Sequence, residues 1–284
     1  MHNNILTIGK LTVHGYGLMI AIGLLATLFV TCHRAKKRAL SVDAVESIVL
    51  LAVIFGFLGA KLLYVIVNFK AFLEKPMSVL GSEGFVVYGG IIVGVLAAYI
   101  YCRWKKLDFL TYADLCMPGV ALAQGFGRLG CFMAGCCYGA ETDSVLGVVF
   151  PAGSMAPVGV KLWPTQLFSA AGDFILCAIL LLLAQKKFRR GVILGLYLAL
   201  YSVGRFIVEF FRNDARGFVG ALSTSQFISI FILAAAVLML LYAGKRPAAS
   251  EEVEPETVPE EPTAEAAAEP VIAEESAGET KADE

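Results

Sequence analysis

Long apolar stretches alternate with short polar segments over the first 245 residues of the chain. Each stretch has roughly the 17–25 residues that a helix needs to cross a bilayer. The pattern predicts an all-α polytopic membrane protein. Its seven transmembrane helices are expected at about 16–32, 44–68, 85–101, 112–129, 165–184, 192–211 and 223–242.

Basic residues concentrate in alternate loops between these stretches. The loops after the first, third, fifth and seventh stretches hold 4, 3, 4 and 2 Lys or Arg, and the other loops hold 2, 1 and 2. Loops enriched in these residues stay in the cytoplasm. We therefore expect the N-terminus outside and the C-terminus in the cytoplasm, and we interpret the cytoplasmic basic clusters as topology signals.

Composition agrees with a membrane protein and separates a second region. Hydrophobic residues make up 58% and charged residues 17% of the chain, and the mean hydropathy is +0.73. Residues 1–247 are predicted to form the membrane domain. Residues 248–284 form an acidic tail rich in Glu, Pro and Ala, which is expected to be disordered because it lacks the apolar residues of a core. The tail carries 13 of the 24 acidic residues, so the preceding part is strongly basic and suits anionic lipids.

The segment 124–139, with the sequence QGFGRLGCFMAGCCYG, combines one arginine with five glycines. Arg128 has no acidic residue near it in the sequence. A lone cation at membrane depth costs about 2.5–3.5 kcal/mol on insertion scales, so such a residue is a functional candidate. Its two interpretations are an anion-binding group and an anchor whose long side chain reaches the lipid headgroups.

The expected topology places further unusual polar groups on the same, outer side. Arg205, Glu209 and Arg212 have i, i+4 and i+3 spacing and therefore share one helix face. Together these groups predict a pocket for an anion, and phosphate is the anion that two arginines beside a bilayer would hold. The other outer groups are His14, Tyr16, Tyr88, Gly89, Gly90 and Gln166.

Each of these residues also has a purely structural interpretation. Tyr16 and Tyr88 would suit the aromatic belt at the membrane surface. Arg205 and Glu209 would form an ordinary ion pair. Gly89-Gly90 would mark a close helix crossing. The functional interpretation rests on their common location.

Several motifs, taken together and in order, resemble one enzyme family. Gly127-Arg128-Leu129-Gly130 after an apolar helix resembles the signature of the prolipoprotein diacylglyceryl transferases. The resemblance implies a seven-helix enzyme at the outer face of the bacterial inner membrane. Further matching segments are 14–19, 88–90, 164–168 and 204–212.

The resemblance also implies a reaction. The enzyme would move the diacylglyceryl group of phosphatidylglycerol onto the lipobox cysteine of a preprolipoprotein, forming a thioether and releasing glycerol 1-phosphate. No metal or organic cofactor and no nucleic acid partner are expected, and the enzyme is expected to act as a monomer. Two competing functions are a phosphatidylglycerol-dependent transferase with another acceptor, and a lipid-binding membrane protein without catalysis.

Individual roles follow from the matched motifs. Arg128 and Arg205 would hold the headgroup phosphate and stabilise its growing charge. Glu209 would orient Arg205, and Tyr88, Tyr16 or water would handle the proton. The substrate-binding candidates are Arg128, Gly89, Gly90, Gly127, Gly130, Gly139, Gln166 and Arg212.

The chain departs from the family pattern in two places. Tyr88 stands where the family commonly has a histidine, the favoured general base, and a phenol with a pKa near ~10 is a poor base at neutral pH. Cys131 stands where many members have an asparagine, and it begins the run Cys131-x4-Cys136-Cys137. These cysteines are interpreted as small packing residues, as a disulfide on the oxidising side, or as a site of thiol chemistry.

Overall fold

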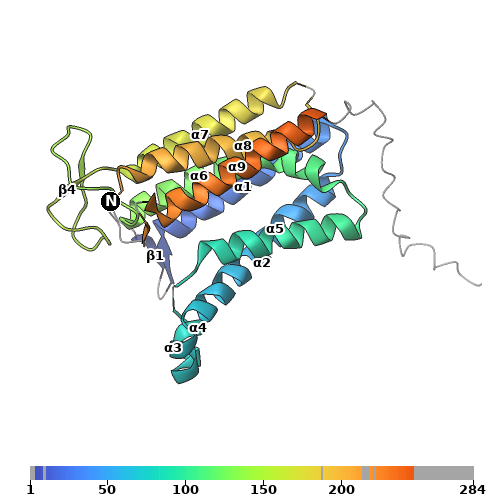
Figure 1. Ribbon diagram of the computed structural model, residues 1–284. Helices are drawn as coiled ribbons and strands as arrows, with labels where there is room; N and C mark the ends of the chain where they lie inside the picture. Colours follow the sequence, from blue (N-terminus) through green and yellow to red (C-terminus); the bar gives the residue numbers. More distant parts are fainter. Residues whose placement is uncertain are drawn as a thin grey trace, which may run out of the picture. The chain divides into compact units, whose positions relative to one another are not determined.

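The computed structural model describes residues 4–8, 11–82, 84–186, 188–212, 218–220 and 222–245. Seven long helices run through this part of the chain (Figure 1). The predicted all-α fold class is therefore confirmed. The long helices are α1 (Gly15–Lys37), α2 (Val42–Val67), α5 (Val87–Trp104), α6 (Phe109–Ala134), α7 (Thr165–Leu183), α8 (Val192–Glu209) and α9 (Thr224–Lys245).

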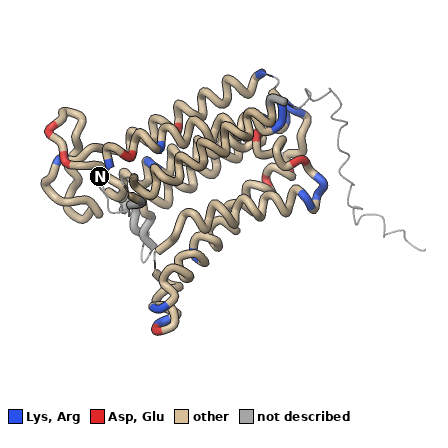
Figure 2. The backbone as a smooth tube through the Cα atoms, viewed as in Figure 1, with Lys and Arg blue, Asp and Glu red and all other residues tan. Residues whose placement is uncertain are grey.

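Each predicted transmembrane stretch coincides with one of these helices. Six of them are long and apolar enough to cross a membrane, and α6 falls outside that set. Polar residues such as Asp114, Gln124 and Arg128 lower the hydropathy of α6, which packs against α1, α7 and α8. The count of seven spans and the orientation remain predictions. Figure 2 shows charged residues gathered mostly near the helix ends.

Smaller elements connect the helices. Before the first predicted helix, β1 (Asn4–Ile8) and β2 (Leu11–His14) pair as an antiparallel hairpin. The predicted boundary at residue 247 and the acidic tail lie outside the described residues. The remaining elements are α3 (Phe69–Glu74), α4 (Pro76–Leu80), β3 (Val148–Val149), β4 (Lys161–Leu162), β5 (Phe218–Val219) and β6 (Leu222–Ser223).

A buried carboxylate joins the two helices that carry the candidate arginines. Asp114 lies in α6, and its side chain accepts hydrogen bonds from the backbone N–H groups of Gly191 at 2.6 Å and Leu194 at 2.7 Å. These groups belong to the first turn of α8, where backbone donors lack partners within the helix and the helix dipole is positive. Asp114 thus caps α8 from a neighbouring helix and fixes the position of α8 against α6.

The basic segment after the first stretch contains one residue that is more than a topology signal. Arg34 is buried, and its guanidinium donates hydrogen bonds to the backbone carbonyls of Asp114 and Leu115. This contact ties the end of α1 to the start of α6. Its role in the structure is to join these two helices.

Helices α2 and α5 form a pair that meets the other helices at one end. A core cluster there joins the start of α2 and the end of α5 to α1 and α6, through residues such as Val45, Cys102 and Leu115. Towards the opposite end, apolar side chains of the pair such as Leu62 and Ile92 are 58% and 65% exposed. In a membrane those side chains would face lipid.

Glycines allow α2 and α5 to approach closely. A Cβ atom on Gly89 would lie 2.4 Å from the carbonyl oxygen of Gly59, and one on Gly90 would lie 2.8 Å from that of Gly56. Both distances are shorter than a van der Waals contact allows. The interpretation of Gly89-Gly90 as a close helix crossing therefore describes their contacts in the structure.

We expect Gly89→Ala to lower the free energy of unfolding by about 1–3 kcal/mol, because the added methyl group meets the backbone of α2 and overpacks the crossing. Unfolding by sodium dodecyl sulfate in mixed micelles measures the change. Gly17→Ala is the matched control, since a Cβ atom there meets nothing within 4 Å. Equal stability of the two variants would contradict the crossing.

Candidate anion-binding site

Arg128 and Arg205 line the same cavity, although they come from different helices. The cavity has a volume of about 90 Å³ and lies among α6, α7 and α8. The two guanidinium groups that the sequence singled out are therefore brought together. The other lining residues are Phe168, Ser169, Gly172, Asp173, Leu176, Leu200, Tyr201, Gly204 and Val208.

Arg205 is held in place by two neighbours. Its Nη1 atom lies 2.5 Å from Oε2 of Glu209, one turn further along α8, as the i, i+4 spacing predicts. Its Nη2 atom donates a hydrogen bond of 2.8 Å to the hydroxyl of Ser225 in α9. Both side chains of the ion pair are largely buried, with 13% and 7% of their surface exposed. The pair thus positions a charged group next to the cavity, where water is scarce.

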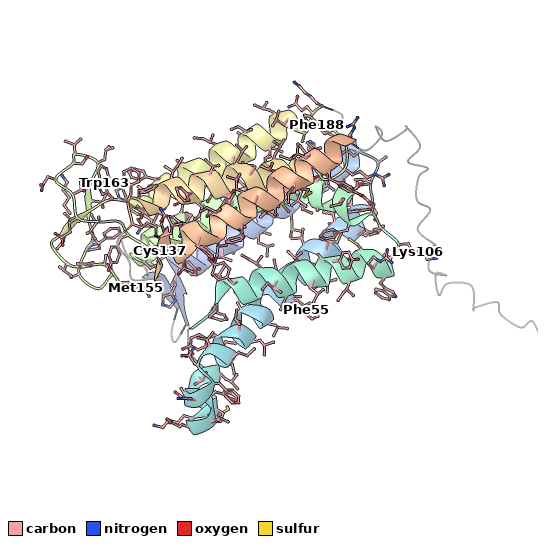
Figure 3. The ribbon with its side chains drawn as sticks, viewed as in Figure 1. Phe55, Lys106, Cys137, Met155, Trp163 and Phe188 are labelled. Atoms are coloured by element: carbon pink, nitrogen blue, oxygen red, sulfur yellow. The ribbon has the colours of Figure 1, made fainter. Side chains whose placement is uncertain are left out.

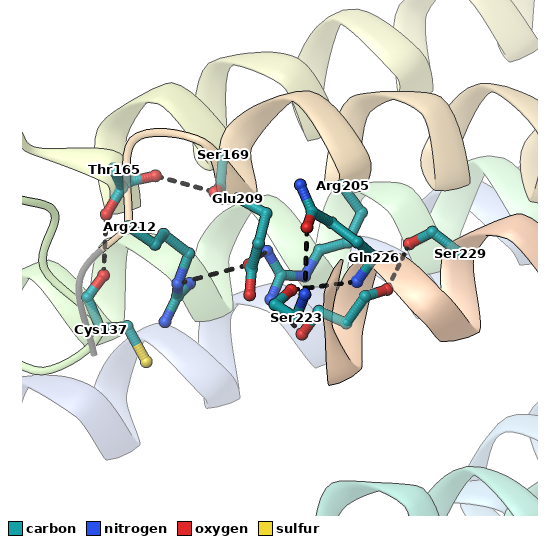
Figure 4. A network of polar contacts seen from close by, with 10 residues as sticks. Cys137, Thr165, Ser169, Arg205, Glu209, Arg212, Ser223, Gln226 and Ser229 are labelled. Carbon is teal, nitrogen blue, oxygen red and sulfur yellow. Dashed lines mark hydrogen bonds and ion pairs between the residues drawn. The ribbon is translucent and has the colours of Figure 1, made fainter. Parts of the chain in front are cut away.

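The start of α9 holds Ser225 in position for this contact. The backbone N–H of Ser223 donates to Oε1 of Gln226 at 3.1 Å, and the N–H of Gln226 donates to Oγ of Ser223 at 3.2 Å (Figure 4). This reciprocal arrangement is a capping box, which Ser-x-x-Gln sequences form at helix starts. The capping box, which can be read from the sequence, therefore helps to position Ser225, one partner of Arg205.

Arg212 extends the same network toward the loop that follows α6. Its Nε atom lies 3.8 Å from Oε2 of Glu209, and its side chain is 3% exposed (Figure 4). Glu209 thus lies between two arginines. Arg128 interacts electrostatically with Arg212 and Tyr201.

Among the described residues, arginines outnumber acidic side chains in and beside the cavity. Three arginines lie there with two acidic side chains, and one of these, Asp173, was not selected in the sequence analysis. Buried charges are stable only when they are paired. The surplus arginine charge therefore favours a bound anion. The groups compared are Arg128, Arg205, Arg212, Asp173 and Glu209.

The last turn of α6 carries Cys131 and the loop after it carries Cys136 and Cys137, and the sulfur atoms of the three lie within 4.8 Å of one another. Gly135 ends α6 in the left-handed conformation, with φ of 71°, and the N–H of Cys136 donates to the carbonyl of Cys131 at 3.1 Å. This helix-ending turn brings the residue after the glycine back over the last helical turn. The sequence Cys-x3-Gly-Cys thus forms a turn that brings Cys131 and Cys136 close together.

The first turn of α7 fixes the cysteine loop from the other side. Gln166 Nε2 donates to the carbonyl of Cys136 at 2.8 Å, and the hydroxyl of Thr165 donates to that of Cys137 at 2.9 Å. Hydrogen bonds from the two neighbouring thiols, and then from Arg212, lower the pKa of Cys137 well below its usual range. Gln166 therefore holds the loop and is absent from the residues that line the arginine cavity.

Two further candidates lie close to this loop. Tyr16, at the start of α1, contacts Gly130, where a Cβ atom would meet its ring at 3.0 Å, and it interacts electrostatically with Arg128. Gly139 admits the chain that follows α8, because a Cβ atom there would lie 2.5 Å from the carbonyl of Phe211. Tyr16 therefore lies near Arg128 and the cysteines, and Gly139 has a structural role next to them.

Four other candidates lie elsewhere. Tyr88 is 45% exposed on α5 and does not line the cavity, and Gly89-Gly90 pack against α2. A Cβ atom on Gly127 would meet nothing within 4 Å. The catalytic and substrate-binding roles of these residues remain predictions.

Sequence reasoning missed Asp173, Ser169 and Tyr201, which all line the cavity. Asp173 had a usable signal, because it is an acidic residue in the middle of an apolar stretch, and such residues mark functional sites by default. Ser169 and Tyr201 carried no comparable signal.

The fold and the cavity define a class: a helical membrane protein with a cavity lined by two arginines. Comparison with known proteins gives the family. The family model described as prolipoprotein diacylglyceryl transferase matches residues 3–242. The chain belongs to this family.

Three similar relatives are clostridial proteins. The chain is 47% identical over 231 residues to phosphatidylglycerol–prolipoprotein diacylglyceryl transferase 2 of Clostridium perfringens strain 13, covering 81% of this chain and 90% of the relative. It is also 47% identical over 225 residues to a phosphatidylglycerol–prolipoprotein diacylglyceryl transferase of Clostridium tetani, covering 78% and 90%. A Clostridium botulinum protein of the same name is 32% identical over 228 residues, covering 78% and 89%.

Proposed function

We propose that the protein transfers the diacylglyceryl group of phosphatidylglycerol to the lipobox cysteine of preprolipoproteins. The family and the relatives support this activity. The observation that carries it is the shared cavity of Arg128 and Arg205, because the reaction needs a cationic site for a phosphate that leaves. One chain supplies both arginines, so we propose that it acts as a monomer.

In the proposed reaction the lipobox thiolate attacks the glycerol carbon that carries the phosphate. A carbon–sulfur bond forms, the carbon–oxygen bond breaks, and glycerol 1-phosphate leaves with the bonding electrons. Negative charge grows on the phosphate as it leaves. Arg128 and Arg205 stabilise that charge at close range in a site with little water, where such interactions are strongest. Glu209 keeps Arg205 in position.

We propose that the site faces the extracytoplasmic side of the bacterial inner membrane. The cavity lies toward the end of α8, and the loops at that end carry fewer Lys and Arg than those at the other end. In Figure 3, Cys137 and Trp163 lie at this end, while Lys106 and Phe188 lie at the opposite end. The exposed apolar surface of α2 and α5 would allow a lipid molecule to approach the protein within the plane of the membrane.

The test is transfer of labelled diacylglycerol from phosphatidylglycerol to a lipobox peptide by the purified protein. We expect label on the cysteine peptide and release of glycerol 1-phosphate, and no label on the matched serine peptide. A protein that binds phosphatidylglycerol but never consumes it would be a lipid-binding protein.

A different acceptor is the second candidate, because Tyr88 and Cys131 depart from the common family pattern. Complementation of a strain depleted of its own transferase separates the two. Rescue supports the lipoprotein as acceptor. Failure to rescue, with phosphatidylglycerol still consumed, supports another acceptor.

We expect Tyr16→Phe to slow transfer more than Tyr88→Phe. Tyr16 contacts Gly130 and interacts electrostatically with Arg128 and the three cysteines, and no such contact is seen for Tyr88 among the described residues. Both rings are partly exposed, at 42% and 45%, and neither lines the cavity. General acid–base groups contribute about 10²–10⁴-fold, so loss of the relevant hydroxyl should be measurable in single-turnover rates. A larger loss in Tyr88→Phe would restore Tyr88 as the proton acceptor, and Tyr88→His would then be the next variant.

A further inference from the structure

We propose that Cys131, Cys136 and Cys137 bind a zinc ion whose fourth coordination position takes the lipobox thiol of the substrate. The three-cysteine cluster is defined by the sulfur atoms of these residues, which lie within 4.8 Å of one another. The second half of this proposal rests on the proposed function; the metal site itself does not.

The separation of the sulfur atoms suits one metal ion. Tetrahedral zinc holds thiolates at about 2.3 Å, which places sulfur atoms about 3.8 Å apart. Soft thiolate ligands select zinc or similarly thiophilic metals over Mg²⁺ or Ca²⁺. The three sulfurs therefore form one face of a coordination tetrahedron. Three protein ligands with an open fourth position are the pattern of catalytic rather than structural zinc.

The backbone around the cysteines holds this face in place. The helix-ending turn at Gly135 places Cys136 over Cys131, and Gln166 and Thr165 hold the following carbonyls from α7. Cys137 has a positive φ of 62°, a conformation that side chains other than glycine seldom adopt. Local strain of this kind gathers at functional sites.

The surroundings of the cluster suit both the metal and the substrate. The three cysteines are partly exposed, so a metal and a substrate thiol have access. Three thiolates and one Zn²⁺ leave one negative charge, and Arg128 and Arg212 lie close enough to interact with Cys137. Arg128 also lines the anion cavity, so the cluster and the phosphate site share one residue.

The zinc ion would promote deprotonation of the substrate thiol. Many family members have a histidine for this step where the present chain has Tyr88. A thiol that coordinates zinc is deprotonated, and its proton passes to water. The bound lipobox thiolate then attacks the glycerol carbon, while the arginines receive the phosphate. The product is a thioether, a weaker ligand than a thiolate, so it leaves the metal. Zinc is not consumed and no electrons are exchanged.

The experiment first measures metal content. The full-length protein is purified in detergent without chelators, and zinc is determined by mass spectrometry after titration and removal of excess. We expect about one zinc per chain in the wild type. Cys136→Ala and Cys131→Ala should bind zinc at least about 10–100-fold more weakly. Cys177→Ala is the matched control, because this cysteine is buried in a separate apolar cluster, and it should bind normally.

A second measurement tests the fourth ligand without lipid and without turnover. The protein is loaded with Co²⁺, whose bands in the visible spectrum report its ligands, and a lipobox peptide is added. We expect the spectrum to change with the cysteine peptide and to stay constant with the serine peptide. Loss of lipid transfer in a protein with normal zinc content and this spectral response would count against the proposed function alone.

Three results would overturn the metal proposal. The first is a wild-type protein that takes up no zinc under reducing conditions. The second is a disulfide between two of the three cysteines in protein from native membranes, mapped by peptide analysis. The third is a folded Cys136→Ala variant, with the unfolding midpoint of the wild type, that binds zinc or transfers lipid as the wild type does.

Discussion

We expect Arg128→Ala to lower the rate of lipid transfer by at least about 10²–10³-fold, the usual cost of removing one group that stabilises charge in a transition state. Arg128 lines the cavity with Arg205 and also interacts electrostatically with Cys131 and Cys137, so it lies near both parts of the proposed reaction. Arg128→Lys should not restore the rate, because an ammonium group lacks the planar pair of donors that grips a phosphate. Single-turnover transfer of labelled lipid measures the effect.

The control for this variant is Arg103→Ala. Arg103 is exposed in the last turn of α5. It belongs to the basic cluster after the third apolar stretch, which we interpret as a topology signal. We expect transfer at the wild-type rate, provided that the orientation is kept. Normal transfer in Arg128→Ala would remove the central claim of the mechanism.

The second large effect is expected for Glu209→Gln. The substitution leaves Arg205 and Arg212 buried without their shared carboxylate, and breaking a buried ion pair costs about 3–5 kcal/mol. We therefore expect a lower free energy of unfolding together with a slower transfer rate, because Arg205 loses one of its two contacts. Unfolding in mixed micelles and single-turnover kinetics measure the two losses separately.

An exposed ion pair elsewhere in the chain provides the comparison. Asp108 lies 3.7 Å from Arg190, and the two side chains are 42% and 48% exposed. Asp108→Asn keeps an acceptor for the N–H of Thr111 at the start of α6 and should change stability by less than about 1 kcal/mol. If Glu209→Gln costs no more than this control, the network around Arg205 is not a stabilising one.

Much of the fold could be predicted because membrane spans depend on local composition. Each apolar stretch became one helix, with ends within a few residues of the expectation. The hairpin of β1 and β2 has a signal of another kind: Leu11-Thr12-Val13-His14 alternates apolar and polar residues, which a pattern of membrane-length apolar stretches does not include. The lower hydropathy of α6 has a tertiary origin: a helix that faces other helices tolerates residues such as Asp114 and Arg128.

The parts of the site that lie on one helix could be predicted from residue spacing. The contacts between different helices could not, because they depend on how the helices pack. Glu209 pairs with Arg205 because four residues on a helix make one turn. Whether Arg128 would meet Arg205 depended on how α6 and α8 pack, which the sequence does not state. Gly89-Gly90 fit both a substrate-binding role and a helix crossing, and the backbone of α2 meets them in the structure. Asp173 carried the signal of a lone charge in an apolar stretch, but its meeting with Arg128 depends on how α6 and α7 pack.

The contact of Asp114 with the start of α8 has a practical consequence for work outside the bilayer. Detergents replace lateral lipid pressure poorly, and helices joined only by apolar surfaces separate first. The seam between α6 and α8 includes two short hydrogen bonds to a carboxylate, which do not depend on lipid. The two arginines should therefore keep their spacing in micelles even where the α2–α5 pair loosens, which makes solubilised protein a fair sample for inhibitor screening.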